Sequence, residues 1–363
     1  MGKGLDERLH LIIISRIKFE IFIHNTYMKF PDITEAFFPV KKQPIYWDDN
    51  PIPEDKSIKE IVDSSYHYLL GLMHFDKDHA AIVDMERKYV FTCANMTYAL
   101  ITNEEAYDWG IEIAKIFFID THDFVCTRLF LNRKRSVCEM DICRKIELNQ
   151  PMINGGWFSF IRIINSYDQS QALSYEVGFY NVLNQYGIIF PDLSIKLYER
   201  HSGSKKKIKE RILKDAMMRT SWRAHQIGID FINKMNKLHG IKMTDIEMFA
   251  LFCKIFKIKQ SSNLTPGQED TLKRQLKFIE NSIKKHCQPD QGNGRDFVNV
   301  IADYIAHFDD NNMKLHINHY QLELGRWVDE FMKVADKGQE AILNYMNEYL
   351  ATAFWFVKIG RSI

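Results

Sequence analysis

The residues whose types and spacing best suit chemistry form one polar stretch, Asn165 to Ser170, in a chain of 363 residues. Asp168 has Asn165 and Ser170 as near neighbours, and a carboxylate among hydrogen-bond donors can bind a cation or act as a general base. The same residue types also satisfy their own backbone in tight turns. We favour the turn and keep Asn165, Asp168 and Ser170 as an alternative polar site.

A second set of residues is suited to binding phosphate. The segment from Ile195 to Arg223 holds ten basic and three acidic residues, a net charge of +7, whereas the whole chain carries +1 and the remainder therefore −6. Clustered cations create a field that attracts a nucleic-acid backbone, although many charge runs are only solvated helix faces. Tyr198 and Trp222 flank the cluster and could stack on bases. The candidate nucleic-acid-binding residues are Arg200, His201, Lys205, Lys206, Lys207, Lys209, Arg211, Lys214, Arg219 and Arg223.

Histidines elsewhere give a weaker indication of a site. His316 and His319 have the i, i+3 spacing that can hold a metal on one helical face, with His307 and Asp309 nearby. Two histidines without further ligands of clear spacing more often mark a solvated helix end. The chain has no dinucleotide-binding glycine motif, no Walker loop and no nucleophile elbow. We therefore expect no catalytic residue, no metal and no cofactor.

Composition indicates a globular chain that keeps its cysteines reduced. With 46% hydrophobic and 26% charged residues, the chain can bury one large core or two smaller ones. Six cysteines without a CxxC pair, and no cleavable secretory signal, predict a cytoplasmic protein without disulfides. The apolar run at 9–24 is broken by Arg16, Lys18 and Glu20, which argues against a membrane-spanning helix. Residues 17–22 alternate as in a strand, or else residues 1–27 are dispensable to the fold.

Hydrophobic periodicity predicts the elements that must position these residues. After a Pro-rich, irregular stretch at 30–55, helices are expected at 57–73 and 104–117, with a strand at 88–100 between them. Alternating segments predict a sheet built from strands at 124–132, 157–164, 173–183 and 188–197. Beyond residue 204 the helical period dominates, with breaks at 261–267 and 288–294 and a last helix at 327–357 interrupted at Gly338.

The predicted fold class is α+β, with a central, mostly antiparallel sheet followed by a helical C-terminal region. We expect three parts: an N-terminal strand and irregular segment at 1–56, an α+β sheet domain at 57–204, and a helical region at 205–363 packed on it. In the strand at 157–164, Phe158, Phe160 and Arg162 point to one face while Ile161 and Ile163 point to the other. Both faces are partly apolar, so helices should cover at least one of them.

From Asn165 the chain reads N-S-x-D-x-S, followed by Gly178-Phe179-Tyr180, Gly187, an apolar strand and Arg200-His201-Ser202-Gly203. This pattern resembles the phage/plasmid-like family of proteins of unknown function, which typically shows N-S-x-D-G-S, G-[FIL]-[FY], a C-x-N-G turn and H-x-G. The stretches at 98–107, YALITNEEAY, and 294–307, GRDFVNVIADYIAH, are similar to the family more loosely. The resemblance implies an α+β fold and a mobile-element setting, and it carries no established activity.

The chain departs from the family pattern at three positions. Gln169 replaces the usual Gly, Asn184 stands at the position of the Cys, and Tyr186 replaces the Asn of the N-G turn. A thiol nucleophile at position 184 is therefore not available to this chain. The Cys of the family is more economically explained as a small buried residue.

Three hypotheses about function follow. The first is a non-enzymatic nucleic-acid-binding protein of a phage, prophage or plasmid, which binds DNA or RNA backbone through a cationic surface. The second is an enzyme acting on nucleic acid or nucleotides through Asp168 and His201. The third is a protein-interaction module directed at host machinery. No membrane partner is expected, and a homo-oligomer is left open.

Overall fold

The computed structural model describes residues 30–47, 74–118, 123–145, 157–181, 186–220, 223–287, 292–308 and 317–361. These residues form two antiparallel sheets and eight α-helices, which confirms the predicted α+β class. The predicted strand at 17–22 and the predicted helix at 57–73 lie outside the described residues. No helix in the described ranges is both long enough and apolar enough to span a bilayer.

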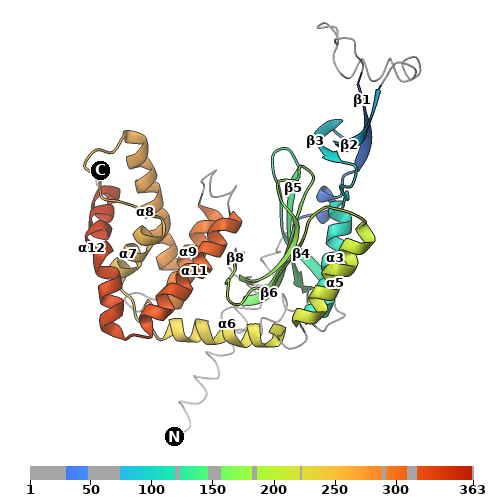
Figure 1. Ribbon diagram of the computed structural model, residues 1–363. Coiled ribbons are helices and arrows are strands. Elements are labelled where there is room, and N and C mark those ends of the chain that lie inside the picture. Colours follow the sequence, from blue (N-terminus) through green and yellow to red (C-terminus); the bar gives the residue numbers. More distant parts are fainter. Residues whose placement is uncertain are drawn as a thin grey trace, which may run out of the picture.

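The smaller sheet extends away from the rest of the molecule (Figure 1). A short 3-10 helix, η1 (Ile33–Ala36), precedes its strands β1 (Val40–Trp47), β2 (His74–Asp84) and β3 (Tyr89–Asn95), which pair in the order β1-β2-β3. The sequence predicted β3, but it missed β2 and wrongly treated β1 as irregular. Pro44 lies at a register shift in β1, and β1 is an edge strand, where a residue without an N–H group is tolerated.

The larger sheet has the strand order β4-β5-β6-β7-β8, with β9 also paired to β7. Its strands are β4 (Phe124–Leu131), β5 (Val137–Arg144), β6 (Trp157–Ser166), β7 (Leu173–Asn181), β8 (Tyr186–Ile188) and β9 (Lys196–Glu199). The sequence predicted β4, β6 and β7. It missed β5, although Cys138, Met140 and Ile142 alternate there with Glu139 and Asp141, and the strand is buried along nearly its whole length.

The single strand predicted at 188–197 is wrong. The chain forms two short strands there, β8 and β9, which pair with different parts of β7. Between them the N–H of Leu193 donates to the carbonyl of Phe190 at 3.0 Å. Pro191 takes the second position of this turn, which its fixed φ angle favours.

Helix α3 (Asn103–Phe118) covers one face of the larger sheet, and α5 (Lys205–Thr220) packs against α3 and β9. A Cβ atom at Gly110 of α3 would lie 2.3 Å from Ile163 of β6, so the helix approaches the sheet closely. The predicted start of α3 is confirmed. Glu105 N donates to Thr102 Oγ1 at 3.1 Å and Thr102 N donates to Glu105 Oε2 at 2.8 Å, which is a capping box.

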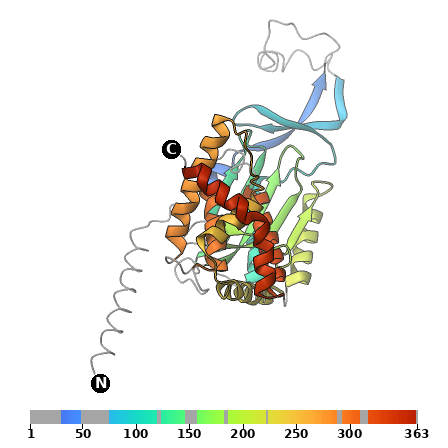
Figure 2. The same cartoon turned by 90° about the vertical axis from the view of Figure 1, so that its left-hand side faces the viewer.

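Helices of the C-terminal helical region lie in front of the strands in Figure 2. This region contacts the other face of the larger sheet, where Gln321 bonds to Arg162, and also the α3 face, where Phe231 packs on Trp157 and Phe179. Its elements are α6 (Arg223–His239), α7 (Asp245–Ile255), α8 (Pro266–His286), α9 (Gly294–His307), α11 (Ile317–Ala335) and α12 (Gln339–Arg361). The predicted breaks at 261–267 and Gly338 are confirmed, and Gly338 has φ +96°. Helix α8 ends before the break predicted at 288–294 and α9 begins at Gly294, but residues 288–291 lie outside the described residues. The predicted start of the last helical stretch at residue 327 is wrong, because α11 already begins at Ile317.

One hydrophobic cluster runs through both the sheet and the helical region. It includes Ile163 of β6, Ile212 of α5, Phe252 of α7 and Phe356 of α12. Hydrophobic contact therefore continues from the sheet into the region beyond residue 204. The domain boundary predicted at that residue stays a prediction. The boundary predicted after residue 56 lies outside the described residues.

Gly325 of α11 should be the least replaceable glycine at the junction of helix and sheet. A Cβ atom there would lie 2.0 Å from the carbonyl oxygen of Ile189, next to β8. We expect Gly325→Ala to lower the free energy of unfolding by about 1–3 kcal/mol through overpacking. Gly228 of α6 has open space around it, so Gly228→Ala should raise that free energy by up to about 1 kcal/mol. Urea denaturation measures both, and equal effects of the two variants would refute the close approach of α11.

Candidate functional site

The polar stretch that begins at Asn165 lies at the end of β6 and joins the larger sheet to α3. Asn165 is fully buried, and its Nδ2 donates to the Ile101 carbonyl at 3.0 Å and to Asn103 Oδ1 at 2.9 Å. The hydroxyl of Tyr167 accepts from the N–H of Asn103 at 2.8 Å. Both side chains therefore hold the start of α3.

Asp168 is engaged within its own turn and with the β4–β5 hairpin. Its Oδ2 accepts from Ser136 Oγ at 2.6 Å and its Oδ1 accepts from the N–H of Ser170 at 3.0 Å. Partial burial raises the pKa of Asp168, but the hydrogen bonds from Ser136 and Ser170 outweigh burial and hold this pKa below its usual value. An ionised carboxylate whose oxygens already accept these bonds is a weak proton acceptor, and the contacts are those of a structural turn.

Gln169 adopts a backbone conformation that favours glycine. Its φ of +62° lies in the left-handed region, and the resembled family carries Gly at this position. The Gln169 side chain compensates in part, because its Nε2 lies 3.4 Å from the Cys93 carbonyl of β3. The turn therefore contacts the smaller sheet as well.

Aromatic rings and one arginine complete the junction between the two sheets. The ring of Tyr167 stacks on Phe91 of β3 at 5.3 Å between centroids and meets Phe38 edge-on at 5.8 Å. Arg135, in the β4–β5 hairpin, places its guanidinium 3.7 Å from the centroid of Phe38 and 2.6 Å from Glu86 Oε2. The stretch Asn165 to Ser170 therefore connects both sheets and α3.

His201 is buried, although the sequence placed it among the nucleic-acid-binding residues. Its side chain stacks on Tyr98 at 5.2 Å, its Nδ1 lies 3.1 Å from the Ala99 carbonyl, and the residue is only 7% exposed. Burial lowers the pKa of His201, which favours the neutral ring. A buried neutral imidazole does not contact phosphate, so we remove His201 from that group. Its observed contacts do not include Asp168, its partner in the enzymatic hypothesis.

Four of the predicted phosphate-binding cations form ion pairs inside the protein. Acids of α3 and β9 supply three partners and α5 itself supplies the fourth. The pairs are Lys205 with Glu105, Lys209 with Glu112, Arg211 with Glu199, and Arg219 with Asp215. The sequence could not reveal the pairs with Glu105 and Glu112, which lie about a hundred residues earlier, whereas Asp215 is only four residues from Arg219.

Four other predicted cations remain exposed without an ion pair in the described part of the chain, namely Arg200, Lys206, Lys207 and Lys214. On α5 the core-facing residues are Ile208, Ile212 and Ala216. Lys207 and Lys214 are seven residues apart and share the opposite side of the helix. The side chains of Arg223 and Trp222 lie outside the described structure. We call Arg200, Lys206, Lys207 and Lys214 the free cations.

A row of alternating charges crosses the face of the larger sheet that α11 contacts at Arg162, and the sequence did not predict it. Strand register places Arg128 of β4, Asp141 of β5, Arg162 of β6, Glu176 of β7 and Lys196 of β9 beside one another in that order. The sequence feature that could have indicated this row is Arg162, a charged residue among the apolar residues of 157–164. Its partners come from a strand that was missed and from strands whose register was unknown.

Arg162 is the centre of this row and is completely buried. Its Nε and Nη2 donate to the two carboxylate oxygens of Asp141 at 2.7 and 2.6 Å, and its Nη1 donates to Gln321 Oε1 of α11 at 2.7 Å. Burial alone would lower the pKa of Arg162, but Asp141 reverses this and raises it. The buried guanidinium therefore stays charged and joins the sheet to the helical region.

The Asp141–Arg162 pair gives a test by double-mutant cycle. We expect Asp141→Asn and Arg162→Met each to cost about 3–5 kcal/mol of unfolding free energy, because each leaves a buried charge without its partner. The double variant should cost less than the sum of the two. Urea denaturation measures the cycle, and the exposed Asp215–Arg219 pair serves as control, with a coupling below about 1 kcal/mol. Additive effects at Asp141 and Arg162 would contradict the assigned geometry.

A second buried carboxylate, Asp303 of α9, gathers donors from α8 and α9. Ser282 Oγ donates to Oδ2 at 2.8 Å, Lys285 Nζ and His307 Nδ1 each lie 3.1 Å from Oδ1, and His286 Nε2 lies 3.4 Å from Oδ2. Burial raises the pKa of Asp303, but these donors, led by His286 and His307, hold it far below its usual range. Of the predicted histidine cluster, His307 thus lies beside the carboxylate of Asp303.

The rest of that histidine cluster offers no site in the described structure. His319 is exposed, whereas Asp309 and His316 lie outside the described residues. In the ranges that the structure describes, no group of three or more His, Cys, Asp or Glu side chains is arranged to hold a metal ion.

Asp303 should make stability depend on acid pH. Because its pKa is lower in the folded protein than in the unfolded chain, its contribution is complete above the unfolded value of about 4 and is lost as the pH falls below it. We expect Asp303→Asn to lower the melting temperature at pH 7, with a difference from the wild type that shrinks below about pH 4. Asp270→Asn, an exposed change on α8, is the control. A constant difference across this pH range would contradict the assignment.

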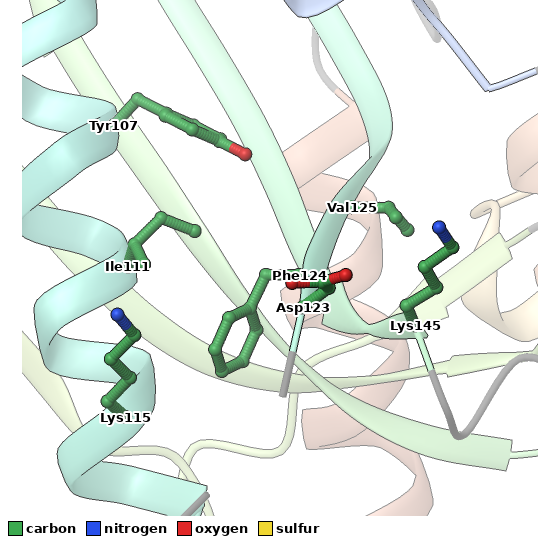
Figure 3. A pocket seen from close by; sticks show the side chains of 7 residues that line it. All are labelled: Tyr107, Ile111, Lys115, Asp123, Phe124, Val125 and Lys145. Atoms are coloured by element: carbon green, nitrogen blue, oxygen red, sulfur yellow. The ribbon is translucent and has the colours of Figure 1, made fainter. Parts of the chain in front are cut away.

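An open pocket of about 340 Å³ lies between α3 and the start of β4 (Figure 3). Lys115 of α3 and Lys145 after β5 stand on opposite sides of it, with Phe124 and Asp123 between them. The two lysines would attract an anion, but Asp123 opposes it. The polar side chains that line the pocket are exposed or half-buried, so none is fixed by burial for recognition of a ligand.

Comparison of the chain with protein-family models, curated proteins and solved structures finds no match. The resemblance to the phage/plasmid-like family therefore stays a prediction.

Proposed function

We propose that this protein binds the phosphate backbone of nucleic acid through the outward side of α5 and the end of β9. The free cations carry the proposal. Arg200, Lys206, Lys207 and Lys214 are exposed and lack an ion pair in the described structure, whereas Lys205 and Lys209 on the same helix pair with α3. A lysine that pairs with a carboxylate has little charge left for a ligand, but a group of unpaired cations favours a polyanion.

The position of α5 supports the proposal. The helix lies at the periphery of the molecule, next to α3, with the rest of the fold on one side of it (Figure 1). A long duplex or single strand can therefore approach its outward side. Contacts to phosphate alone carry no base information, so the binding is independent of sequence. A cytoplasmic protein of a phage, prophage or plasmid, the setting implied by the sequence resemblance, is the biological context that we propose with it.

The test is a salt titration of binding to labelled duplex DNA. We expect the affinity to fall as salt rises, with a slope of the logarithmic plot of about −0.9 for each phosphate neutralised. The variant Lys206→Gln/Lys207→Gln/Lys214→Gln should weaken binding and reduce the magnitude of this slope by about three units, with an unchanged melting temperature because the side chains are exposed.

A matched variant controls for net charge. Lys277, Lys284 and Lys333 are exposed on α8 and α11, and Lys277→Gln/Lys284→Gln/Lys333→Gln removes the same charge far along the chain from α5. This control should bind as the wild type does. Absence of binding at low salt, or equal losses in both triple variants, would refute a site on α5.

A further inference from the structure

The outward face of β9 presents an aromatic ring between two cations. Strand alternation places Lys196 and Tyr198 on one face, and exposed Arg200 follows at the end of the strand. The other face meets the core and α5, since Leu197 is buried and Glu199 pairs with Arg211 of α5 at 2.7 Å. Contacts on the opposite face of β9 thus hold in place the strand that carries Tyr198.

Tyr198 is unusually exposed for an aromatic residue on a strand. At 67% it is the most exposed large apolar or aromatic side chain in the described part of the chain. Its cross-strand neighbour on β7 is Ser174, which is too small to cover the ring. Next to Tyr198, Lys196 is half exposed and forms an ion pair with the largely buried Glu176, with 3.9 Å between Nζ and Oε2. Exposed apolar surface next to the unpaired cation Arg200 indicates a ligand with both flat apolar and anionic parts.

We infer that Tyr198 stacks on an unpaired base, so that the ligand class is single-stranded nucleic acid. This inference rests on the proposed function. The bases of a duplex already stack and pair with one another, and their faces are not available to a side chain, whereas a single strand exposes them. Arg200 lies beside Tyr198, where it reaches a phosphate that flanks a stacked nucleotide. Lys196, on the other side of Tyr198, is half exposed and shares its charge with Glu176.

The neighbouring helix extends this path for the backbone. The Glu199–Arg211 ion pair holds α5 against β9, and Lys207 and Lys214 lie one helical turn on either side of Arg211. Tyr198 and α5 lie on opposite faces of β9, which pairs only with β7 among the described strands. A strand whose base rests on Tyr198 therefore passes round the outer edge of β9 to reach these further cations. Because every base has a flat face, stacking of this kind is tolerant of sequence.

The experiment measures binding of a labelled oligothymidylate of about 20 nucleotides, and of a duplex of the same length, to full-length protein. Tyr198→Ala should weaken binding of the single strand by about fivefold to a hundredfold, the effect of losing one stacked base, and leave duplex binding unchanged. Tyr198→Phe should restore the affinity because the ring is kept. Tyr89→Ala removes another exposed tyrosine, on β3 of the smaller sheet, and should bind both ligands as the wild type does.

The outcomes separate this inference from the proposed function. If the triple lysine variant of α5 weakens both ligands but Tyr198→Ala weakens neither, or weakens both equally, base stacking is wrong and backbone binding stands. A Tyr198→Phe variant that binds as weakly as Tyr198→Ala also overturns stacking. If the triple lysine variant binds as the wild type does, the proposed function fails. If Tyr198→Ala weakens binding of the single strand and Tyr198→Phe restores it, the result supports both base stacking and the proposed function.

Discussion

The burial of one guanidinium constrains how this protein is assembled. Arg162 is withdrawn completely from water, and a charge is removed from water at a cost of several kcal/mol unless its hydrogen bonds are replaced. Asp141 replaces two of them from the neighbouring strand and Gln321 replaces one from α11. Strand register and the position of α11 must therefore both be correct, since a slip of one residue would turn Arg162 to the opposite face of the sheet.

Local patterns in the sequence predicted most of the helices but only some strands of the two sheets. Helix α3 could be predicted because Thr102 and Glu105 form a cap and Trp109 and Ile113 repeat at a helical period. Strand β5 was missed although its residues alternate, and the burial of Glu139 and Asp141 could not be predicted because their partners Arg128 and Arg162 lie on other strands. The cationic segment was visible in the sequence. Its division into paired and free cations was not, because that depends on where α3 packs.

The motif that resembles a known family and the surface proposed for binding have different physical roles. From Asn165 to Ser170 the side chains bond to backbone and to one another and fix the meeting point of two sheets and a helix. Such residues are constrained by geometry and need no ligand. The free cations and Tyr198 show the opposite character, since they leave polar and apolar groups exposed to solvent. A motif that resembles a family can therefore lie apart from the surface proposed for binding.

The contact between Arg162 and Gln321 also sets an order of events during folding. Asp141 and Arg162 are 21 residues apart and can meet when β5 and β6 pair, whereas Gln321 is 159 residues from Arg162. A ribosome that has made only the sheet has not yet made α11, so the last hydrogen bond of Arg162 must come from water at that stage. The sheet face thus stays hydrated until most of the chain has emerged, and its final closure is a late, long-range step.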